Sequence, residues 1–323
     1  MSYYLVTGVA GFIGWKVAEK LLLEGNSVVG VDNLSPFYDV RLKHWRLKQL
    51  QKFSNFRFFN LDLSNFSALK ILLEFYPIKA IIHLAAQAGV RQSFENPQIS
   101  VESNIVATLN LLELMKEFRI SKLILASTSS VYAGKKIPFT ENLKVDNPLS
   151  VYAATKRGAE LLAYTYHYFY GLDITVFRYF TVYGPAGRPD MSIFRFIKWI
   201  YEERTIEIYG DGTQARDFTY IDDIAEGTLL GLKPLGYEII NLGGGQNPVS
   251  INQIIELLET YLRKKAKKLY LPFHKADLKV TWADISKAKK LLGWEPKVSL
   301  EEGLRRTVEW SLENINLIRE IQV

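Results

Sequence analysis

The run Thr7-Gly8-Val9-Ala10-Gly11-Phe12-Ile13-Gly14 lies between a short hydrophobic segment, residues 3–7, and a segment with helical periodicity, residues 12–24. Glycines in the spacing G-x-x-G-x-x-G between a strand and a helix are typical of a loop that binds dinucleotide phosphates. They allow a tight turn, close approach of the backbone to a pyrophosphate, and close helix packing. The alternative is a plain strand-to-helix turn. The predicted cofactor contacts of this loop are Gly8, Gly11, Phe12, Ile13 and Gly14.

Strands and helices alternate along the first half of the chain. Short β-branched or aromatic runs predict strands at residues 3–7, 27–31, 56–59, 80–84, 122–126 and 174–178. Apolar residues at three- and four-residue spacing predict helices at residues 12–24, 42–52, 66–75, 100–118 and 152–170. This alternation predicts an α/β fold, with a Rossmann-type doubly wound parallel sheet.

Beyond Gly184 the pattern becomes irregular and rich in glycine and proline, with only two further helices expected, at residues 252–264 and 300–314. We therefore expect a smaller, partly interleaved C-terminal α/β lobe for the substrate. The predicted division is residues 1–183 for the dinucleotide and residues 184–323 mainly for the substrate, with the chain crossing back between them.

Composition excludes several classes of protein. The 323 residues include 40 basic and 34 acidic side chains, a net charge of +6, and the two signs alternate without a basic arm, so no nucleic-acid partner is expected. Zero cysteines exclude disulfides, thiolate catalysis and cysteine metal sites. No signal-peptide pattern and no apolar run of about 20 residues is present, so we expect a cytoplasmic protein with no membrane partner.

Two acidic residues indicate which dinucleotide is bound. Asp32 stands 18 residues after Gly14, where its carboxylate would accept the adenosine ribose hydroxyls and repel a 2′-phosphate, which favours NAD over NADP. Asp62, in the run Asn60-Leu61-Asp62-Leu63, is placed to meet an adenine amino group; a helix N-cap is the alternative.

Tyr152 and Lys156 are four residues apart in a predicted helix and therefore share one face. A phenol with a pKa of about 10 is a poor base at neutral pH. A positive charge at about 4 Å, at an effective dielectric near 20, contributes ~4 kcal/mol, or roughly three pKa units. We therefore predict that Lys156 lowers the pKa of Tyr152 enough for catalysis, whereas surface decoration is the alternative for an isolated pair.

With this spacing of glycines and the Tyr-x-x-x-Lys pair, the chain resembles the extended short-chain dehydrogenase/reductase superfamily, in its branch that modifies nucleotide sugars. The run His83-Leu84-Ala85-Ala86-Gln87-Ala88 is similar to that branch's fourth-strand motif. We interpret His83 as a structural imidazole and expect no metal site. The resemblance implies a tightly bound NAD that is not consumed, with further contacts at Asn33, Leu63, Leu84, Ala85, Ala86 and Gln87.

The third catalytic residue of the superfamily, a hydroxyl, corresponds to Thr128, and the resemblance therefore implies that Thr128, Tyr152 and Lys156 are the catalytic residues. Dehydratases of the branch carry Asp-Glu where Ser129-Ser130 stand, and decarboxylases acting on UDP-glucuronate carry glutamate at the position of Ser130. Because this chain lacks both, the resemblance implies oxidation and re-reduction at one carbon, which is epimerisation.

The segment Arg178-Tyr179-Phe180-Thr181-Val182-Tyr183-Gly184-Pro185-Ala186-Gly187-Arg188-Pro189-Asp190-Met191 resembles the signature of UDP-glucuronate 4-epimerases. Galactose-type relatives usually have asparagine at Thr181 and no arginine at Arg188. A guanidinium is well matched to the carboxylate of a hexuronate. The alternative for Arg188 is a salt bridge in a surface loop.

The resemblance extends to Gln87-Ala88-Gly89-Val90-Arg91-Gln92-Ser93 and to Arg216-Asp217-Phe218-Thr219-Tyr220. It implies that Arg216 meets the diphosphate of the substrate; an ion pair with Asp217 or Asp222 is the alternative. Two runs depart from the family pattern, Val131-Tyr132-Ala133 and Ala276-Asp277, and the second concerns the uridine side. The predicted substrate-binding residues are Thr128, Ser129, Ser130, Thr181, Arg188, Arg216, Gln87 and Arg91.

The predicted activity is NAD-dependent C4 epimerisation of a UDP-hexuronic acid, UDP-glucuronate to UDP-galacturonate, through a 4-keto intermediate. A UDP-galactose or UDP-N-acetylhexosamine 4-epimerase is one alternative, and a non-catalytic NAD-binding protein is another. Helices at residues 100–118 and 152–170 commonly pair across a dimer in this branch, so we expect a homodimer.

Overall fold

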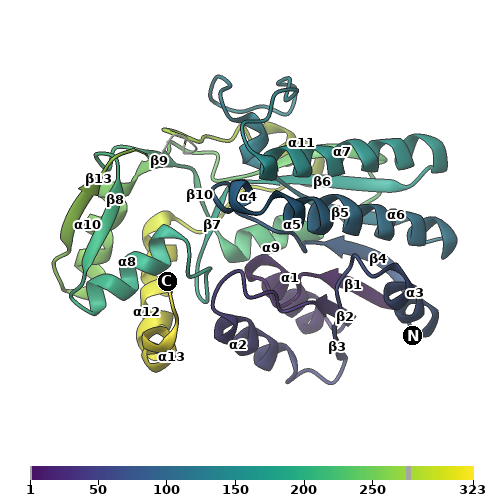
Figure 1. The fold of residues 1–323 in the computed structure, drawn as a ribbon, viewed down its shortest axis with the longest axis horizontal. Helices are drawn as coiled ribbons and strands as arrows, with labels where there is room; N and C mark the ends of the chain where they lie inside the picture. The colour runs from purple at the N-terminus through teal and green to yellow at the C-terminus, as the bar shows by residue number, and fades with distance from the viewer. Residues whose placement is uncertain (1, 274–277) are drawn as a thin grey trace.

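The computed structural model describes residues 2–273 and 278–323, and its centre is a seven-stranded sheet in which every neighbouring pair is parallel. The strand order is β11-β6-β5-β4-β1-β2-β3 (Figure 1). The strands are β1 (Tyr3–Thr7), β2 (Ser27–Asp32), β3 (Phe56–Asn60), β4 (Ile78–His83), β5 (Lys122–Thr128), β6 (Asp173–Tyr179) and β11 (Tyr237–Leu242).

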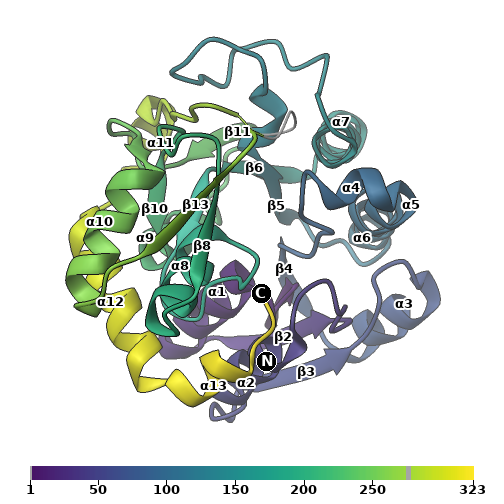
Figure 2. The ribbon, with the colours of Figure 1, turned by 60° about the vertical axis from the view of Figure 1, so that its left-hand side comes forward.

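Helices cover both faces of this sheet, as predicted for a Rossmann-type fold (Figure 2). One face packs against α1 (Phe12–Leu23), α2 (Val40–Leu50), α9 (Ile221–Leu230) and α11 (Ser286–Leu292). The other packs against α3 (Phe66–Phe75), α6 (Ala107–Glu117) and α7 (Val151–Tyr170). Strand β2 is buried along its whole length, which explains its continuous apolar run.

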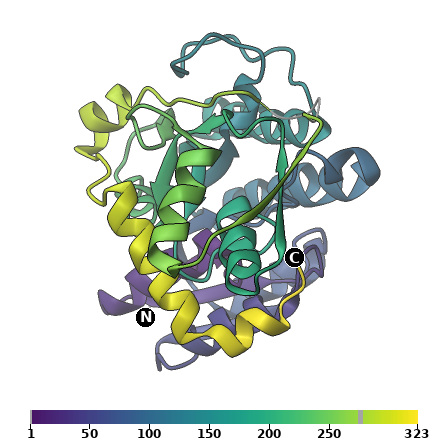
Figure 3. The ribbon, with the colours of Figure 1, turned by 90° about the vertical axis from the view of Figure 1, so that its left-hand side faces the viewer.

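A second core lies beside the sheet and contains α8 (Ser192–Tyr201), α10 (Ile251–Leu262) and α12 (Leu300–Glu313) (Figure 3). Three short strand pairs accompany it. They are β7 (Thr181–Tyr183) with β10 (Phe218–Tyr220), β9 (Ala215–Arg216) with β12 (Val249–Ser250), and β8 (Thr205–Tyr209) with β13 (Lys267–Leu271). A final helix, α13 (Ile315–Glu320), brings Gln322 to Asp39 before α2, where the Gln322 amide donates a hydrogen bond of 2.8 Å.

The fold class, all six predicted strands and the two helices expected beyond Gly184, α10 and α12, are confirmed, but the expectation that only two helices follow Gly184 was wrong. Strand β11 joins the main sheet beside β6, so the chain does cross back, and the described residues after Gly184 form six helices. The division at residue 183/184 stays a prediction.

The helix predicted at residues 100–118 is interrupted. It begins earlier, as α5 (Pro97–Val101) after the short α4 (Gln92–Glu95), and passes through the π-helical turn η1 (Glu102–Val106) before α6. The wide turn points Asn104 into the protein, where it is fully buried. Within residues 2–273 and 278–323, no helix is both long enough and apolar enough to cross a bilayer.

Candidate active site

A cleft of about 730 Å³ opens at the carboxyl ends of the parallel strands. Ligands of doubly wound sheets bind where the strand order reverses, which is here between β1 and β4. The predicted residues that line the cleft are Gly8, Gly11, Phe12, Ile13, Gly14, Asp32, Asn33, Asp62, Leu63, Leu84, Ala85, Ala86, Gln87, Thr128, Ser129, Ser130, Tyr152, Lys156, Thr181 and Arg188.

The glycine loop forms one wall of the cleft. Gly8 has φ +66°, a left-handed conformation that favours glycine. A Cβ added at Gly14 would lie 2.1 Å from the Gly8 carbonyl oxygen, so only glycine allows this close packing of α1. Helix α1 has Gly11 at its N-cap and no side-chain cap, which leaves the first-turn N–H groups oriented toward the cleft for an anion.

Asp32 ends β2 at the cleft, as predicted. Its carboxylate accepts hydrogen bonds from the backbone amides of Ala10 at 3.1 Å and Leu34 at 2.8 Å. The ammonium of Lys43, from α2, lies 3.4 Å away and also lines the cleft. Lys43 was missed by the sequence reasoning because its partner is decided by the packing of α2 against β2.

Asp62 lies at the cleft but does not cap a helix, because the N-cap of α3 is Asn65. Its carboxylate accepts hydrogen bonds from the side-chain amide of Asn33 at 2.8 Å and from the Ser64 amide at 2.9 Å. These hydrogen bonds keep the pKa of Asp62 below its usual value, although burial opposes them. The alternative of an N-cap is therefore wrong for Asp62.

His83 has the structural role predicted for it. It is fully buried, with Nδ1 2.7 Å from the Thr7 hydroxyl and Nε2 3.1 Å from the Thr108 hydroxyl. Burial, with a smaller contribution from the charge of Lys156, lowers its pKa to about 3, so the imidazole stays neutral. Over the described ranges, no three His, Asp or Glu residues cluster in a way that could hold a metal ion.

Asn104 fixes the segment that follows β4. Its side-chain oxygen accepts the Gln87 amide at 2.9 Å, and its side-chain nitrogen donates to the Thr155 hydroxyl at 3.0 Å. Asn104 thereby links Gln87 to Thr155 of α7, the residue directly before Lys156. A single asparagine in an amphipathic run gives no signal in the sequence, and only the π-helical turn η1 brings it to this position.

Tyr152, Lys156 and Thr128 meet in the cleft as predicted. Helix α7 begins after its N-cap Ser150, whose side chain accepts the Ala153 amide, so Tyr152 and Lys156 lie in the first two turns. Thr128 ends β5, caps the short 3-10 helix η2 (Ser129–Tyr132), and forms a hydrogen bond with the Tyr152 hydroxyl.

Without its cofactor the protein does not show the predicted effect of Lys156 on Tyr152, which stays a prediction for the site with its dinucleotide bound. Burial raises the pKa of Tyr152, and the opposing influences come from the Thr128 hydrogen bond and the charge of Arg188. Burial also lowers the pKa of Lys156 to about 8, although the nearby Glu160 opposes it. Desolvation therefore disfavours both charged forms, a cost that the spacing argument left out.

Lys156 gives a test of whether a dinucleotide fits this cleft. Its side chain is 1% exposed, and its ammonium has no hydrogen-bond partner among the described residues. A buried ammonium without acceptors is unfavourable, so the site is complete only with a ligand that supplies oxygen acceptors. Ribose hydroxyls meet that requirement, and the capless start of α1 suits a pyrophosphate.

Ser129, Ser130, Thr181 and Arg188 lie on the side of the cleft predicted for the sugar. Arg188 is partly buried and forms a two-pronged ion pair with Asp190, at 3.0 and 2.6 Å. Its guanidinium also lies over the ring of Phe37, at 5.5 Å. The salt bridge that was the alternative for Arg188 is thus present, and it holds the guanidinium at the wall of the cleft.

Two predicted substrate residues do not line the cleft. The Arg91 guanidinium stacks 4.4 Å above the ring of Tyr209, and Arg216 donates to the carbonyl of Ala215 at 2.9 Å. The carboxylate of Asp217 accepts the amides of Ala283 and Gly245, and Asp222 lies 3.3 Å from Lys16. The uridine contact at Asp277 falls outside the described residues.

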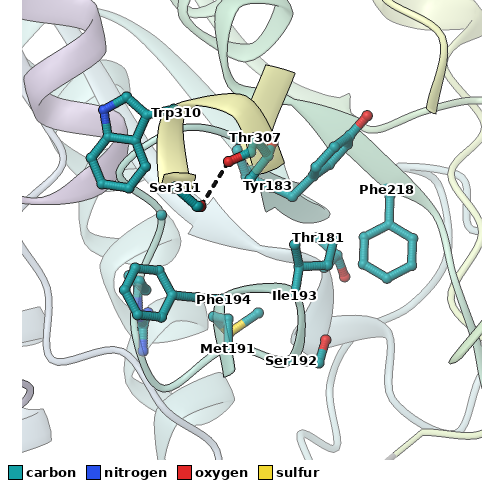
Figure 4. A pocket seen from close by; sticks show the side chains of 14 residues that line it. Thr181, Tyr183, Met191, Ser192, Ile193, Phe194, Phe218, Thr307, Trp310 and Ser311 are labelled. Carbon is teal, nitrogen blue, oxygen red and sulfur yellow. Dashed lines mark hydrogen bonds between the residues drawn. The ribbon is translucent and has the colours of Figure 1, made fainter. Parts of the chain in front are cut away.

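A smaller pocket lies behind the segment that carries Arg188 (Figure 4). Met191 and Phe194 face it from one side and Trp310 of α12 from the other. Thr181, Arg188 and Met191 line both this pocket and the larger cleft. The smaller pocket has a volume of about 20 Å³, so the segment packs closely against the side chains behind it.

Comparison with known proteins gives a consistent set of similarities. Residues 5–307 match the family described as GDP-mannose 4,6 dehydratase. The chain is 72% identical to a UDP-glucuronate 4-epimerase of Thermodesulfobacterium geofontis over 100% of both chains. It superposes with a TM-score of 0.91 on UDP-glucuronic acid 4-epimerase of Bacillus cereus in complex with UDP-glucuronic acid and NAD, at 41% identity, covering 97% of this chain and 99% of that one.

A UDP-glucose 4-epimerase of Thermotoga maritima with UDP-glucose is also similar. It superposes with a TM-score of 0.86 at 33% identity, covering 97% of this chain and 99% of that one.

Proposed function

The chain belongs to the GDP-mannose 4,6 dehydratase family of extended short-chain dehydrogenases/reductases, and we propose that it converts UDP-glucuronate to UDP-galacturonate by NAD-dependent C4 epimerisation. The observation that carries this proposal is that Arg188 and Thr181 share a cleft with Tyr152 and Lys156. A hydroxyl-activating pair and a carboxylate-matching guanidinium therefore act on one sugar.

Dehydration, the reaction in the family's description, is disfavoured at the positions that would perform it. Elimination of water across C5 and C6 needs an acid and a base beside the ring, and here Ser129 and Ser130 stand there. A serine hydroxyl donates and accepts hydrogen bonds but does not carry a proton away at neutral pH. Oxidation and re-reduction at one carbon need neither group.

Several groups of the cleft would hold the cofactor. The first-turn amides of α1 suit the pyrophosphate, Asp32 and Asn33 suit the adenosine ribose, and Lys156 suits the second ribose. Bound NAD would supply a hydride acceptor and a positively charged ring, and it would not be consumed in the reaction. Ribose oxygens at Lys156 would favour its charged form, and that charge would in turn favour the phenolate of Tyr152.

The protein's own residues handle the protons. Tyr152 accepts the proton of the sugar 4-hydroxyl while Thr128 shares a hydrogen bond with the same oxygen. When the 4-ketone is reduced again from the opposite face, Tyr152 returns the proton. Between the two steps the 4-keto uronate rotates so that its opposite face is presented for reduction, while its UDP remains anchored.

The carboxylate contacts have a second task. The intermediate is a β-keto acid, and it loses CO₂ when the bond from C5 to the carboxylate is perpendicular to the ketone plane. Held by Arg188, Thr181 and Ser130, that bond stays near the plane, where overlap with the carbonyl is poor. The proposed site thus retains CO₂ as well as selecting the uronate.

We also propose a cytoplasmic homodimer. Support comes from α5, α6 and α7, which pack side by side and expose apolar side chains. Ile99, Leu161 and Tyr164 are 41%, 51% and 51% exposed, and a second copy would cover them. Sedimentation should give twice the mass of one chain for the wild type and the mass of a single chain for Leu161→Glu.

The proposed cytoplasmic location is supported by the lack of cysteine, which creates no need for an oxidising compartment. Residues 184–323 are proposed as mainly the sugar-binding lobe.

Incubation of the purified protein with UDP-glucuronate, without added NAD, followed by chromatography of the UDP-sugars tests the proposal. We expect UDP-galacturonate, with little UDP-pentose. Parallel incubations with UDP-glucose and UDP-N-acetylglucosamine should give far slower turnover. Preferred turnover of a neutral sugar would favour the hexose alternative, and no turnover of any sugar would favour a non-catalytic NAD-binding protein.

A further inference from the structure

Arg46 is a fully buried arginine of α2 whose guanidinium binds only neutral acceptors among the described residues. It donates to the carbonyl of Ala186 at 3.1 and 2.7 Å, and to the carbonyl of Gly187 at 3.2 Å. It also donates to the carbonyl of Ala10 at 2.9 Å and to the Tyr38 hydroxyl at 2.7 Å.

These acceptors come from three separate segments of the chain. Ala10 belongs to the glycine loop, and Tyr38 to the segment after β2 that lines the cleft. Ala186 and Gly187 directly precede Arg188. The guanidinium also lies 5.8 Å above the ring of Phe12, the first residue of α1. Arg46 therefore joins the cofactor loop to the loop that carries Arg188.

The loop before Arg188 has features that require an external restraint. Ala186 has φ +52°, a left-handed conformation that is unfavourable for a residue with a Cβ. The smaller pocket behind the loop, lined by Gly184, Gly187 and Arg188, has a volume of only about 20 Å³. Packing therefore restrains the loop on that side, but none of the described residues there donates a hydrogen bond to the carbonyls of Ala186 and Gly187. Arg46 approaches the loop from α2, and its hydrogen bonds to the carbonyls of Ala186 and Gly187 hold the left-handed backbone in place.

We propose that Arg46 is a positioning residue for substrate selection: it holds the loop at Ala186 and Gly187 so that Arg188 faces the carboxylate of the sugar. The role rests on the proposed function of Arg188. A lysine keeps the charge but has only three donors, all on one nitrogen, so it cannot make the five hydrogen bonds that the planar guanidinium fork makes to four separate acceptors. Arg46→Lys therefore tests geometry separately from charge.

The main variant is Arg46→Lys. The milder variant Tyr38→Phe removes one hydrogen-bond acceptor of Arg46, and it is expected to fold even if Arg46→Lys does not. Arg41→Lys is the control, because Arg41 lies on the same helix, is 41% exposed and pairs with Asp39. For each protein, dissociation constants for UDP-glucuronate and UDP-glucose are measured, together with NAD content, the UDP-pentose fraction and amide hydrogen exchange of residues 184–191.

For Arg46→Lys we expect UDP-glucuronate to bind 10-fold or more weakly, UDP-glucose to change less than twofold, and the pentose fraction to rise. Exchange at the amides of Gly187 and Met191, which bond to Gly184 and Arg188 carbonyls, should accelerate at least 10-fold. Tyr38→Phe should shift the same readouts in the same direction by less. Arg41→Lys should match the wild type.

Equal weakening of both sugars, or a loss confined to NAD content, would overturn the selection role and leave Arg46 as a structural residue. Unchanged exchange in residues 184–191 would overturn the positioning of the loop, whatever the sugar preference. A wild-type protein that itself binds UDP-glucose as well as UDP-glucuronate would instead refute the proposed function, and with it the selection role, while the exchange result would still decide the loop restraint.

Discussion

The guanidinium of Arg178 donates two hydrogen bonds, at 2.9 and 2.7 Å, to the carboxylate of Glu160, and both side chains are buried. Glu160 lies one helical turn beyond Lys156 on α7. Burial raises the pKa of Glu160, but the hydrogen bonds and charge of Arg178 outweigh it and leave the pKa below its usual value. A buried carboxylate thus stays charged close to the unpartnered ammonium.

Glu160→Gln is expected to destabilise the protein by about 3–5 kcal/mol, because Arg178 would remain buried without its counter-ion. The control is Glu309→Gln, since Glu309 pairs with Arg305 on the exposed side of α12. That change should cost less than about 1 kcal/mol. Urea unfolding gives both free energies. Similar losses for the two variants would show that the buried pair contributes no more than a surface one.

Lys156→Met should change how stability depends on pH. The folded protein releases the Lys156 proton near pH 8, while the unfolded chain holds it up to pH 10.5, so the unfolded state binds more protons between these values. Wild-type stability relative to Lys156→Met should therefore rise between pH 8 and 10.5, by ~3 kcal/mol. The comparison uses protein freed of dinucleotide. Parallel stability curves across that range would contradict the buried, charged state of Lys156.

Tyr152→Phe should lower kcat for UDP-glucuronate by about 10²- to 10⁴-fold, the usual contribution of a positioned acid–base group. NAD content should stay near wild type, and stability should fall by only about 0.5–1.5 kcal/mol, because the variant loses a single hydrogen bond, the one to Thr128. Tyr168→Phe, at an exposed position of the same helix, serves as the control and should retain full turnover. Retention of more than a tenth of the wild-type kcat by Tyr152→Phe would exclude it as the acid–base group.

Arg188→Gln should lower kcat/KM for UDP-glucuronate by about 10- to 100-fold, as expected for losing hydrogen bonds to a charged group. The UDP-pentose fraction should rise at the same time, because the carboxylate is no longer held near the ketone plane. The control Arg204→Gln changes an exposed arginine that lies 3.5 Å from Glu202. Chromatography of products gives both readouts, and an unchanged product ratio with retained activity would contradict the role of Arg188.

Gly14→Ala should abolish NAD retention, because its Cβ would lie 2.1 Å from the Gly8 carbonyl oxygen and displace the glycine loop. Gly158→Ala is the matched control, since its Cβ would meet only the flexible end of the Ile105 side chain, at 2.6 Å. That variant should retain NAD. Absorbance of the released cofactor measures both. Normal NAD content in Gly14→Ala would show that the loop tolerates the displacement.

Much of the cleft could be predicted because its chemistry is encoded in contiguous runs. Gly8, Gly11 and Gly14 act within one strand-to-helix turn, and Tyr152 and Lys156 share a helix face by their spacing. Such features depend on local geometry, which the order of residues specifies directly. Strand β11 was not predicted, and its place beside β6 is a long-range pairing that no local pattern specifies.

The fold class, the glycine loop, the Tyr-x-x-x-Lys pair and the segment around Arg188 could all be predicted from sequence, since each depends on patterns within short stretches of chain. Three other features depend on how the chain packs: Arg46 reaches Ala186, 140 residues away, Asn104 holds Gln87, and burial raises the pKa of Tyr152. Burial and long-range hydrogen bonds arise when distant segments pack together and exclude water, and spacing along the chain carries no record of that.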